Sequence, residues 1–172
     1  MKKFELTAEF VTNVFGKKLF RIKALVAFGN VEKGELGGFI EKEDNLSHSG
    51  NAWVSDNVWV SDNALVSGNA QVSDNARVSG DAQVSGNARV YNNADYTVVI
   101  GFGHCFRATT FFRCKDKILR VQCGCFYGDL AQFREIVKKT HGDSKYAKEY
   151  LAIADLMELH FSDDEEKQEA AK

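Results

Sequence analysis

The chain has 172 residues, of which 44% are hydrophobic and 27% charged, and its formal net charge at pH 7 is −2. A chain of this size can bury the core of one or two small domains. Its net charge is too small to mark it, by charge alone, as a nucleic-acid-binding or membrane-surface protein. No apolar run is long enough to cross a bilayer, and the opening MKKFELTAEF has a strand pattern, so we expect a cytoplasmic protein that engages no membrane and keeps its four cysteines as thiols.

Residues 1–38 are predicted to form an N-terminal β cap. Residues 3–10 and 19–25 alternate like two strands around a polar turn that contains Asn13 and Gly16. The end of a stack of strands exposes unpaired backbone groups. We therefore expect this segment to cover the repeat that follows it.

Residues 51–95 repeat with a period of six. They run NAWVSD, NVWVSD, NALVSG, NAQVSD, NARVSG, DAQVSG, NARVYN and a fading NADYTV. Alanine (valine at 58) and a valine two residues later alternate like strand residues that face one side, and the Gly/Asp–Asn pair is typical of turns. Strands this short bury enough apolar surface only by stacking, so the period predicts a β-solenoid over residues 39–95.

The phase of the repeat predicts which side chains face inward. If three hexads form one coil, residues eighteen apart lie above one another and the valines form inner ladders. The valines are at positions 54, 60, 66, 72, 78, 84 and 90. Ile40 and Leu46 fall in the alanine phase, and His48 falls in the valine phase. An inward His48 fits a ligand or base, or a hydrogen-bonded residue of an imperfect first rung.

The outward positions of the first coil are apolar, in contrast to the polar ones that follow. They are Trp53, Trp59 and Leu65. Large apolar patches usually mark an interface, so we expect the N-terminal segment or a second subunit to cover these binding candidates.

Residues 96–161 are predicted to form a C-terminal ββ(β)αα module. Two or three antiparallel strands rich in β-branched and aromatic residues lead to ILRVQCGCF. Asp129 and Gln132 form a capping box for a first helix, and Asp143 or Ser144 begins a second. Residues 162–172 are expected to be a charged tail.

The hexads resemble those of the hexapeptide-repeat family, whose small-x-aliphatic pattern builds a triangular left-handed β-helix. The resemblance implies a mainly β fold with about three left-handed coils, and a homotrimer about the helix axis. A dimer through the C-terminal module is the alternative. The flanks FGNVEKGELGGFIEKEDNLS and HGDSKYAKEYL resemble small proteins of phages and prophages.

Cysteines and histidines supply candidates for metal or nucleophilic chemistry. Cys114, Cys123, Cys125 and His104 are candidate zinc ligands, although no C-x-x-C knuckle is present. The Cys-x-Cys spacing predicts that Cys123 and Cys125 point the same way along one strand. Cys125 with His104 or His141 is a candidate nucleophile pair, but free cysteines are also common core residues.

Two absences direct the functional prediction away from catalysis. Acyltransferases of the resembled family carry a histidine on a loop between coils, whereas residues 51–92 contain neither an insertion nor a histidine. We expect a non-enzymatic binding protein without a cofactor, such as an anti-CRISPR-like phage inhibitor of a host defence protein or nucleotide signal. An acyl- or nucleotide-sugar transferase with a degenerate site at His48 or His104 is the alternative.

A basic stretch in the C-terminal module predicts a second alternative, nucleic-acid binding. The candidate contacts are Arg107, Thr109, Arg113, Lys115, Lys117 and Arg120. Phe106, Phe111 and Phe112 interleave with them, as aromatic residues do in single-strand binders.

Overall fold

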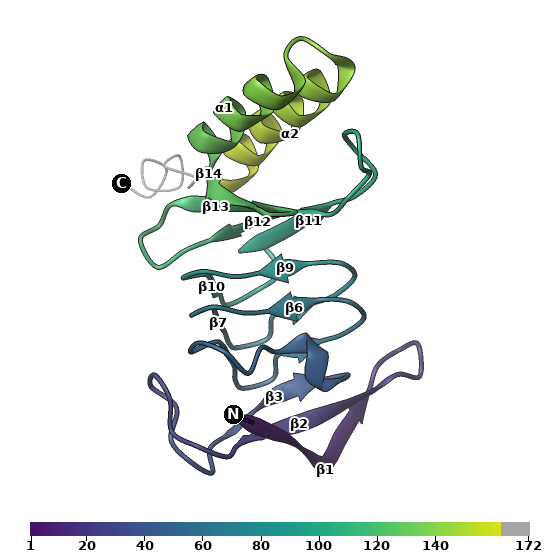
Figure 1. Cartoon of the computed structure of the whole chain (residues 1–172). Helices are drawn as coiled ribbons and strands as arrows, with labels where there is room; N and C mark the ends of the chain where they lie inside the picture. The colour runs from purple at the N-terminus through teal and green to yellow at the C-terminus, as the bar shows by residue number, and fades with distance from the viewer. Residues whose placement is uncertain (163–172) are drawn as a thin grey trace, which may run out of the picture.

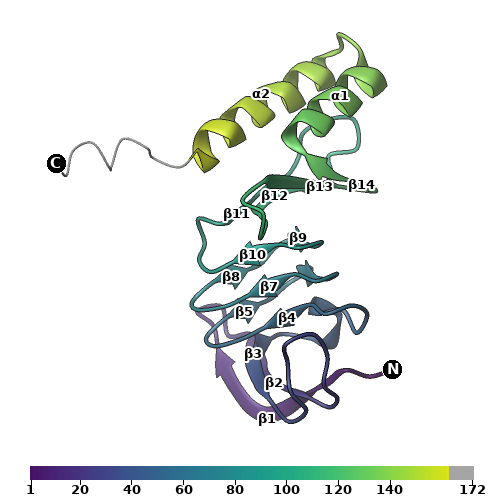
Figure 2. The ribbon, with the colours of Figure 1, turned by 90° about the vertical axis from the view of Figure 1, so that its left-hand side faces the viewer.

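The computed structural model describes residues 1–162 (Figures 1 and 2), so the predicted tail lies outside the described residues apart from Ser162. The described chain is mainly β, with two helices at its C-terminal end. Short stacked strands lie between a group of N-terminal strands and a C-terminal sheet that carries the helices on its outer face (Figure 1). Within this part of the chain, neither helix has the length and hydropathy of a membrane span.

The N-terminal strands form the hairpin that the sequence predicts. The three strands are β1 (Phe4–Thr12), β2 (Lys18–Ala24) and β3 (Leu36–Ile40). β1 and β2 pair antiparallel across a turn in which the Asn13 side chain accepts hydrogen bonds from the N–H groups of Phe15 and Lys17. β3 joins this sheet to the repeat, because it pairs with β2 on one side and with β5 of the solenoid on the other.

Two-residue strands of the repeat stack in parallel and confirm the solenoid. They are β4 (Trp53–Val54), β5 (Trp59–Val60), β6 (Leu65–Val66), β7 (Gln71–Val72), β8 (Arg77–Val78), β9 (Gln83–Val84) and β10 (Arg89–Val90). Residues eighteen apart are partners, so that Val54, Val72 and Val90 form one ladder. Every valine of the predicted set is at most 1% exposed, which confirms that they share one apolar interior.

The corners of the coil confirm the turn chemistry. The residue after each serine of the hexads has a left-handed backbone with φ between 52° and 66°; these residues are Asp56, Asp62, Gly68, Asp74, Gly80 and Gly86. Asp and Gly are among the residues that adopt this conformation most readily, which explains why each of these corners has one or the other.

At its N-terminal end the repeat slips by two residues. Phe39 pairs with Trp59 and Leu46 with Val66, a separation of twenty instead of eighteen. Ile40 and Leu46 therefore align with valines, and the prediction that they lie in the alanine phase was wrong. His48 is not enclosed in the interior, since 32% of its side chain is exposed. Its ring stacks on Phe4 with centroids 4.3 Å apart and its Nδ1 accepts the N–H of Lys3, which agrees with the alternative of a hydrogen-bonded residue in an imperfect first rung.

Two buried side chains supply hydrogen bonds that a preceding coil would otherwise donate. Inside the stack the Trp53 N–H donates to the carbonyl of Ala70, seventeen residues later. The carbonyl of Ala52 instead accepts from Lys3 Nζ at 2.9 Å. The carbonyl of Ala64 accepts from Nδ2 of Asn45, at the end of the short 3-10 helix η1 (Glu43–Asn45), at 2.8 Å. In both cases a side-chain donor takes the place of a backbone N–H and satisfies a carbonyl that would be costly to bury unpaired.

The C-terminal module has four antiparallel strands and two helices. They are β11 (Tyr96–Val99), β12 (Thr109–Arg113), β13 (Leu119–Cys123), β14 (Phe126–Asp129), α1 (Leu130–His141) and α2 (Lys145–Phe161). The capping box of Asp129 with Gln132 and the cap at Ser144 are confirmed. β14 was not expected, because the chain turns at Gly124 (φ 59°), so Cys123 and Cys125 do not alternate along one strand as predicted.

The central strand β12 closes the far end of the solenoid. Phe112 belongs to the core of the solenoid, whereas Phe111 packs among the helices. The hydroxyl of Thr110 accepts the N–H of Gln83 at 3.0 Å, and the Lys115 N–H donates to the carbonyl of Asn87. Both ends of the stack are therefore covered within the chain.

Candidate functional site

A cleft of about 590 Å³ lies between the turn of the β1–β2 hairpin and one face of the solenoid. The hairpin contributes Asn13, Val14, Phe15, Lys17 and Leu19, and strands β5 and β8 with their corners contribute Trp59, Ser61, Asp62, Arg77, Val78 and Ser79. The hairpin reaches this face because β2, β3, β5 and β8 are successive neighbours in one sheet.

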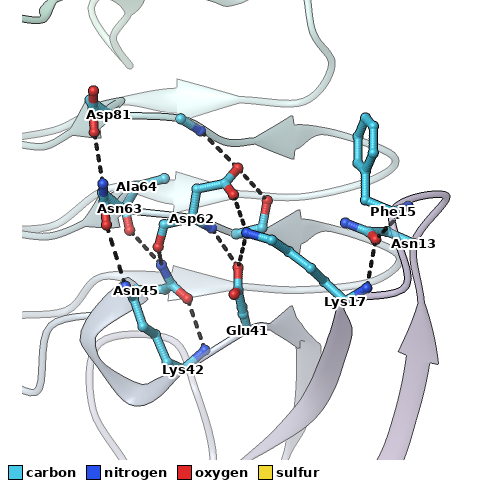
Figure 3. A network of polar contacts seen from close by, with 12 residues as sticks. Asn13, Phe15, Lys17, Glu41, Lys42, Asn45, Asp62, Asn63, Ala64 and Asp81 are labelled. Atoms are coloured by element: carbon cyan, nitrogen blue, oxygen red, sulfur yellow. Dashed lines mark hydrogen bonds and ion pairs between the residues drawn. The ribbon is translucent and has the colours of Figure 1, made fainter.

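A polar network holds the hairpin against the solenoid at one side of the cleft (Figure 3). The ammonium of Lys17 forms an ion pair with Asp62 and lies 3.5 Å from Oε2 of Glu41. The Asp62 N–H donates to the same Glu41 oxygen at 2.7 Å. The three residues come from the hairpin, the end of β3 and a corner of the coil, so the network joins separate parts of the chain.

The corner geometry of the repeat orients the Asp62 carboxylate that pairs with Lys17. Its left-handed backbone places the carboxylate where Oδ2 accepts the N–H of Gly80 in the next coil, at 3.2 Å. The hydrogen bond from Lys17, followed by that from Gly80, lowers the pKa of Asp62 below its ordinary value. Conversely, the hydrogen bond to Asp62 raises the pKa of Lys17.

The rest of the cleft wall is apolar and aromatic. The guanidinium of Arg77 lies over the ring of Trp59, 3.7 Å from its centroid. Opposite it, Val14 and Phe15 at the hairpin turn are 93% and 83% exposed. Two apolar side chains this exposed beside a Trp–Arg stack are typical of a recognition surface. The carboxylate of Asp62 is already paired with the ammonium of Lys17 and accepts the N–H of Gly80, so the cleft is better suited to binding than to acid–base chemistry.

The three apolar candidates of the first coil lie in different environments. Trp53 is 2% exposed and packs edge-on against Phe28 of the N-terminal segment, with ring centroids 5.5 Å apart. Trp59 lines the cleft, and Leu65 is half-buried on β6. The chain's own N-terminal segment therefore covers Trp53, and of the three only Trp59 lies at the cleft.

The predicted basic cluster is divided among several places. Arg113, Lys115 and Lys117 line a pocket of about 510 Å³. Arg107 lines a separate cavity, and Arg120 pairs with Asp116 at 2.7 Å. Thr109 is 1% exposed and hydrogen-bonds to Cys123 within the sheet.

Phe111 and Phe112, which interleave with the basic residues in the sequence, cannot stack with bases as aromatics of single-strand binders do, since both side chains are fully buried. Strand alternation sends one of them into each core, because β12 is covered on both faces. Phe106 is 66% exposed and is the member of this aromatic set that reaches solvent.

The zinc candidates are not gathered at one point. Cys114 is buried beside Ala88 at the end of the solenoid, whereas His104, Cys123 and Cys125 line a cavity under the helices. Over residues 1–162, no three His, Cys, Asp or Glu side chains are placed to hold a metal ion. His104, proposed as a partner of Cys125, instead contacts Cys105, with Nδ1 and Sγ 3.3 Å apart.

The residues of the cleft were missed by the sequence analysis, apart from Trp59. The signal was present in the turn TNVFGKK, which places two apolar residues at the tip of a hairpin where polar residues are usual. The position of the turn against Arg77 depends on the sheet order, which the repeat pattern does not contain.

A family model described as the YdcK Beta solenoid repeat matches residues 70–83 and 82–94 of the chain. These residues carry strands β7 to β10 and their corners. The match and the parallel ladders together define the chain as a β-solenoid repeat protein with a C-terminal helical module. None of the curated proteins matches the chain.

Proposed function

We propose that the chain is a non-enzymatic binding protein that recognises a partner protein through the cleft between the β1–β2 hairpin and the solenoid. The observation that carries this proposal is the exposure of Val14 and Phe15 opposite the Arg77–Trp59 stack. Trp and Arg are enriched among the residues that dominate binding energy at protein interfaces. The polar network of Lys17, Glu41 and Asp62 fixes the hairpin, so binding costs little ordering of the surface.

The partner is a protein that presents an apolar or aromatic side chain beside a carboxylate. The apolar group fills the cleft between Phe15 and Trp59, and the carboxylate meets the guanidinium of Arg77. The resemblance of the flanks to phage-encoded proteins favours a host protein in the cytoplasm, with the chain acting as an antagonist of a defence system. The alternative ligand of such an antagonist is a nucleotide signal of the host, which is smaller than a protein partner.

The solenoid is further proposed to be the left-handed, three-sided β-helix of the hexapeptide-repeat type, with about three coils. The eighteen-residue spacing of its ladders supports three hexads per coil. The same resemblance favours a homotrimer about the helix axis. Native mass spectrometry of the full chain distinguishes a trimer from the alternative dimer.

Affinity capture from host lysate with matched variants tests the proposal. Phe15→Ser and Arg77→Glu should each lose the proteins that the wild-type chain retains. Leu159→Ser removes a 72% exposed side chain from α2, at the other end of the molecule, and is the control. With a purified partner, calorimetry should show each cleft variant weakened by about 2 kcal/mol, roughly 30-fold in Kd. Identical captured sets for all variants would contradict the cleft as the binding surface.

A second candidate function, binding of a nucleic acid, is favoured by the pocket at the end of the solenoid. Arg89 and Tyr91 of the last hexad line it together with Arg113, Lys115 and Lys117. Fluorescence anisotropy with a single-stranded oligonucleotide should then show binding that weakens steeply with salt and is lost in a Lys115→Glu/Lys117→Glu variant. Absence of binding at low salt would remove this candidate.

A further inference from the structure

A cavity of about 320 Å³ in the C-terminal module is lined by three of the four cysteines of the chain. The polar residues around it include His104, Cys105, Arg107, Cys123, Cys125 and Tyr150. Its apolar wall comes from Phe126 at the start of β14 and from Phe133 and Val137 of α1. The C-terminal module lies at the opposite end of the solenoid from the β1–β2 hairpin (Figure 1).

Cys105 lies at the solvent side of this cavity between two nitrogen-bearing side chains. Its Sγ is 3.3 Å from Nδ1 of His104, and the thiol is exposed. The interaction with His104, and after it that with Arg107, lowers the pKa of the Cys105 thiol. An exposed thiol next to an imidazole and a guanidinium has the surroundings of a reactive cysteine.

The position of Arg107 is determined by the backbone around it. Its guanidinium rests against Gly124, at the place where any other residue would carry its Cβ. The hydrogen bond to the Cys105 thiol is the main cause that raises the pKa of Arg107, and the nearby charge of Cys123 adds to it in the same direction. Arg107 therefore lies in the same cavity as both thiols, and Gly124 provides the space for it.

The loop that carries Cys105 is attached to α2. The Gly103 N–H donates to Oε2 of Glu149 at 3.0 Å, and the ring of Tyr150 occupies the space beside Gly103 where a side chain would lie. The next residue, His104, packs edge-on against Tyr146 with ring centroids 5.8 Å apart. These contacts hold the thiol at the mouth of the cavity.

Cys123 is the second thiol of this arrangement. Its Sγ accepts a hydrogen bond from the hydroxyl of Thr109 at 3.2 Å, and it neighbours the hydroxyl of Tyr150. Cys114, by contrast, is buried at the end of the solenoid, and burial raises the pKa of its thiol. The chain thus contains an internal comparison between a thiol suited to reaction and one that is not.

We propose that this cavity is a thiol–disulfide exchange site, at which Cys105 reacts with a small anionic disulfide of the glutathione type. The Cys105 thiolate attacks one sulfur of the disulfide, so that a mixed disulfide forms and the S–S bond of the small molecule breaks. The departing thiolate takes a proton from solvent or from His104. The Cys123 thiolate then attacks the Cys105 sulfur, which forms a Cys105–Cys123 disulfide and releases the second small thiol. The small disulfide is the oxidant for both electrons, and Arg107 provides the positive charge that attracts its carboxylates.

The experiment uses the full reduced chain with oxidised glutathione as the probe, followed by acid quenching, intact-mass measurement and peptide mapping. We expect glutathionylation of Cys105 about tenfold faster than that of Cys125, the exposed thiol in the same cavity. Cys123→Ser should accumulate the mixed disulfide, which the wild-type chain converts to an internal disulfide. Cys114→Ser should behave as the wild type.

The role of Arg107 is tested by comparing two probes, each on the wild-type chain and on the Arg107→Gln variant. Cys105 should prefer oxidised glutathione over the neutral bis(2-hydroxyethyl) disulfide more strongly than Cys125 does, and Arg107→Gln should abolish that preference. Equal rates at Cys105 and Cys125, or formation of the same internal disulfide in Cys123→Ser, would overturn the proposal. Neither result bears on the binding cleft, so the two proposals fail independently.

Discussion

Phe111 and Phe112 are consecutive residues of β12, yet their side chains belong to two separate cores. Phe112 packs with the valines and alanines of the solenoid, and Phe111 packs edge-on against Phe133 of α1 with ring centroids 6.0 Å apart. One strand therefore fastens the helical module to the end of the repeat. Its two faces do not compete, because alternate side chains of a strand point in opposite directions.

Truncating either ring should destabilise the protein in a different place. Phe111→Ala and Phe112→Ala should each lower the free energy of unfolding by about 3–5 kcal/mol, since each leaves a buried cavity. Hydrogen exchange should show faster exchange in α1 for the first variant and in the last hexads for the second. Phe102→Ala, at a 43% exposed position, is the control and should have little effect. Identical exchange patterns in the two core variants would contradict the separation of the cores.

Lys3 should contribute to stability through the hydrogen bonds it donates, and not through its charge. Lys3→Met keeps the aliphatic stem but removes the donor to the carbonyls of Ala52 and Gly50, and should cost about 1–3 kcal/mol. Urea unfolding measures the loss. Lys2→Met, which removes a half-exposed ion pair with Glu43, should cost less than about 1 kcal/mol. Equal losses for the two lysines would show that the buried carbonyls are not dependent on Lys3.

Burial of Lys3 should also make stability rise at alkaline pH. Burial lowers the pKa of Lys3 from 10.5 to about 8, so between these values the unfolded chain binds the proton more tightly than the folded one. The contribution of Lys3 to the free energy of unfolding is therefore fully present above the unfolded pKa of 10.5 and decreases as the pH falls towards 8. Denaturation of the wild type and Lys3→Met at pH values across this range should show the rise only in the wild type.

The ion pair of Lys17 and Asp62 should make the hairpin sensitive to acid. Because the folded pKa of Asp62 lies below its unfolded value, its contribution is present above the unfolded pKa and is lost as the pH falls through the folded one. Asp62→Asn should therefore lose less stability than the wild type on acidification. Asp56→Asn is the matched control, because Asp56 has the same corner position and accepts the N–H of Asp74. A normal acid response in Asp62→Asn, equal to that of the wild type, would contradict the role of the pair.

Two glycines of the repeat should differ sharply in their tolerance of substitution. Gly80 and Gly86 have φ values of 66° and 61°, but a side chain at 80 meets open space, whereas one at 86 meets Tyr127. Gly80→Asp should be nearly neutral, because aspartates adopt this conformation at the equivalent corners. Gly86→Asp should cost about 1–3 kcal/mol more, through overpacking against Tyr127. Thermal unfolding compares the two, and equal melting temperatures would show that Tyr127 yields without cost.

The repeat made most of the solenoid predictable, since each hexad has its inward and corner residues at fixed positions. The hairpin, both helix starts and the inward valines were predicted from local patterns, whereas the eighteen-residue ladders also required three hexads per coil, which the family resemblance implied. The pattern fails where the chain departs from the period: two additional residues between Leu46 and Val66 place His48 outside the core. A period cannot reveal an insertion that lies before its first regular hexad.

The candidate sites were less predictable, because they depend on contacts between distant segments. The pairing of Lys17 with Asp62 joins residues 45 positions apart, and the turn of Gly124 beside Arg107 was not recognised inside ILRVQCGCF. Phe111 and Phe112 appeared available to bases because alternation alone does not say whether both faces of a strand are covered. Local sequence patterns indicate where the strands and helices lie, but the order of the strands in the sheets determines which of them contact one another.

The covered ends of the solenoid have a consequence for how copies of this chain can assemble. A bare coil end would offer its row of hydrogen-bonding groups to the opposite end of another molecule, and such head-to-tail contacts grow into filaments. Lys3 occupies acceptors at one end, and Thr110 occupies a donor at the other. Growth along the axis by pairing of bare coil ends is thereby disfavoured, so any contact between copies of the chain would use other surfaces.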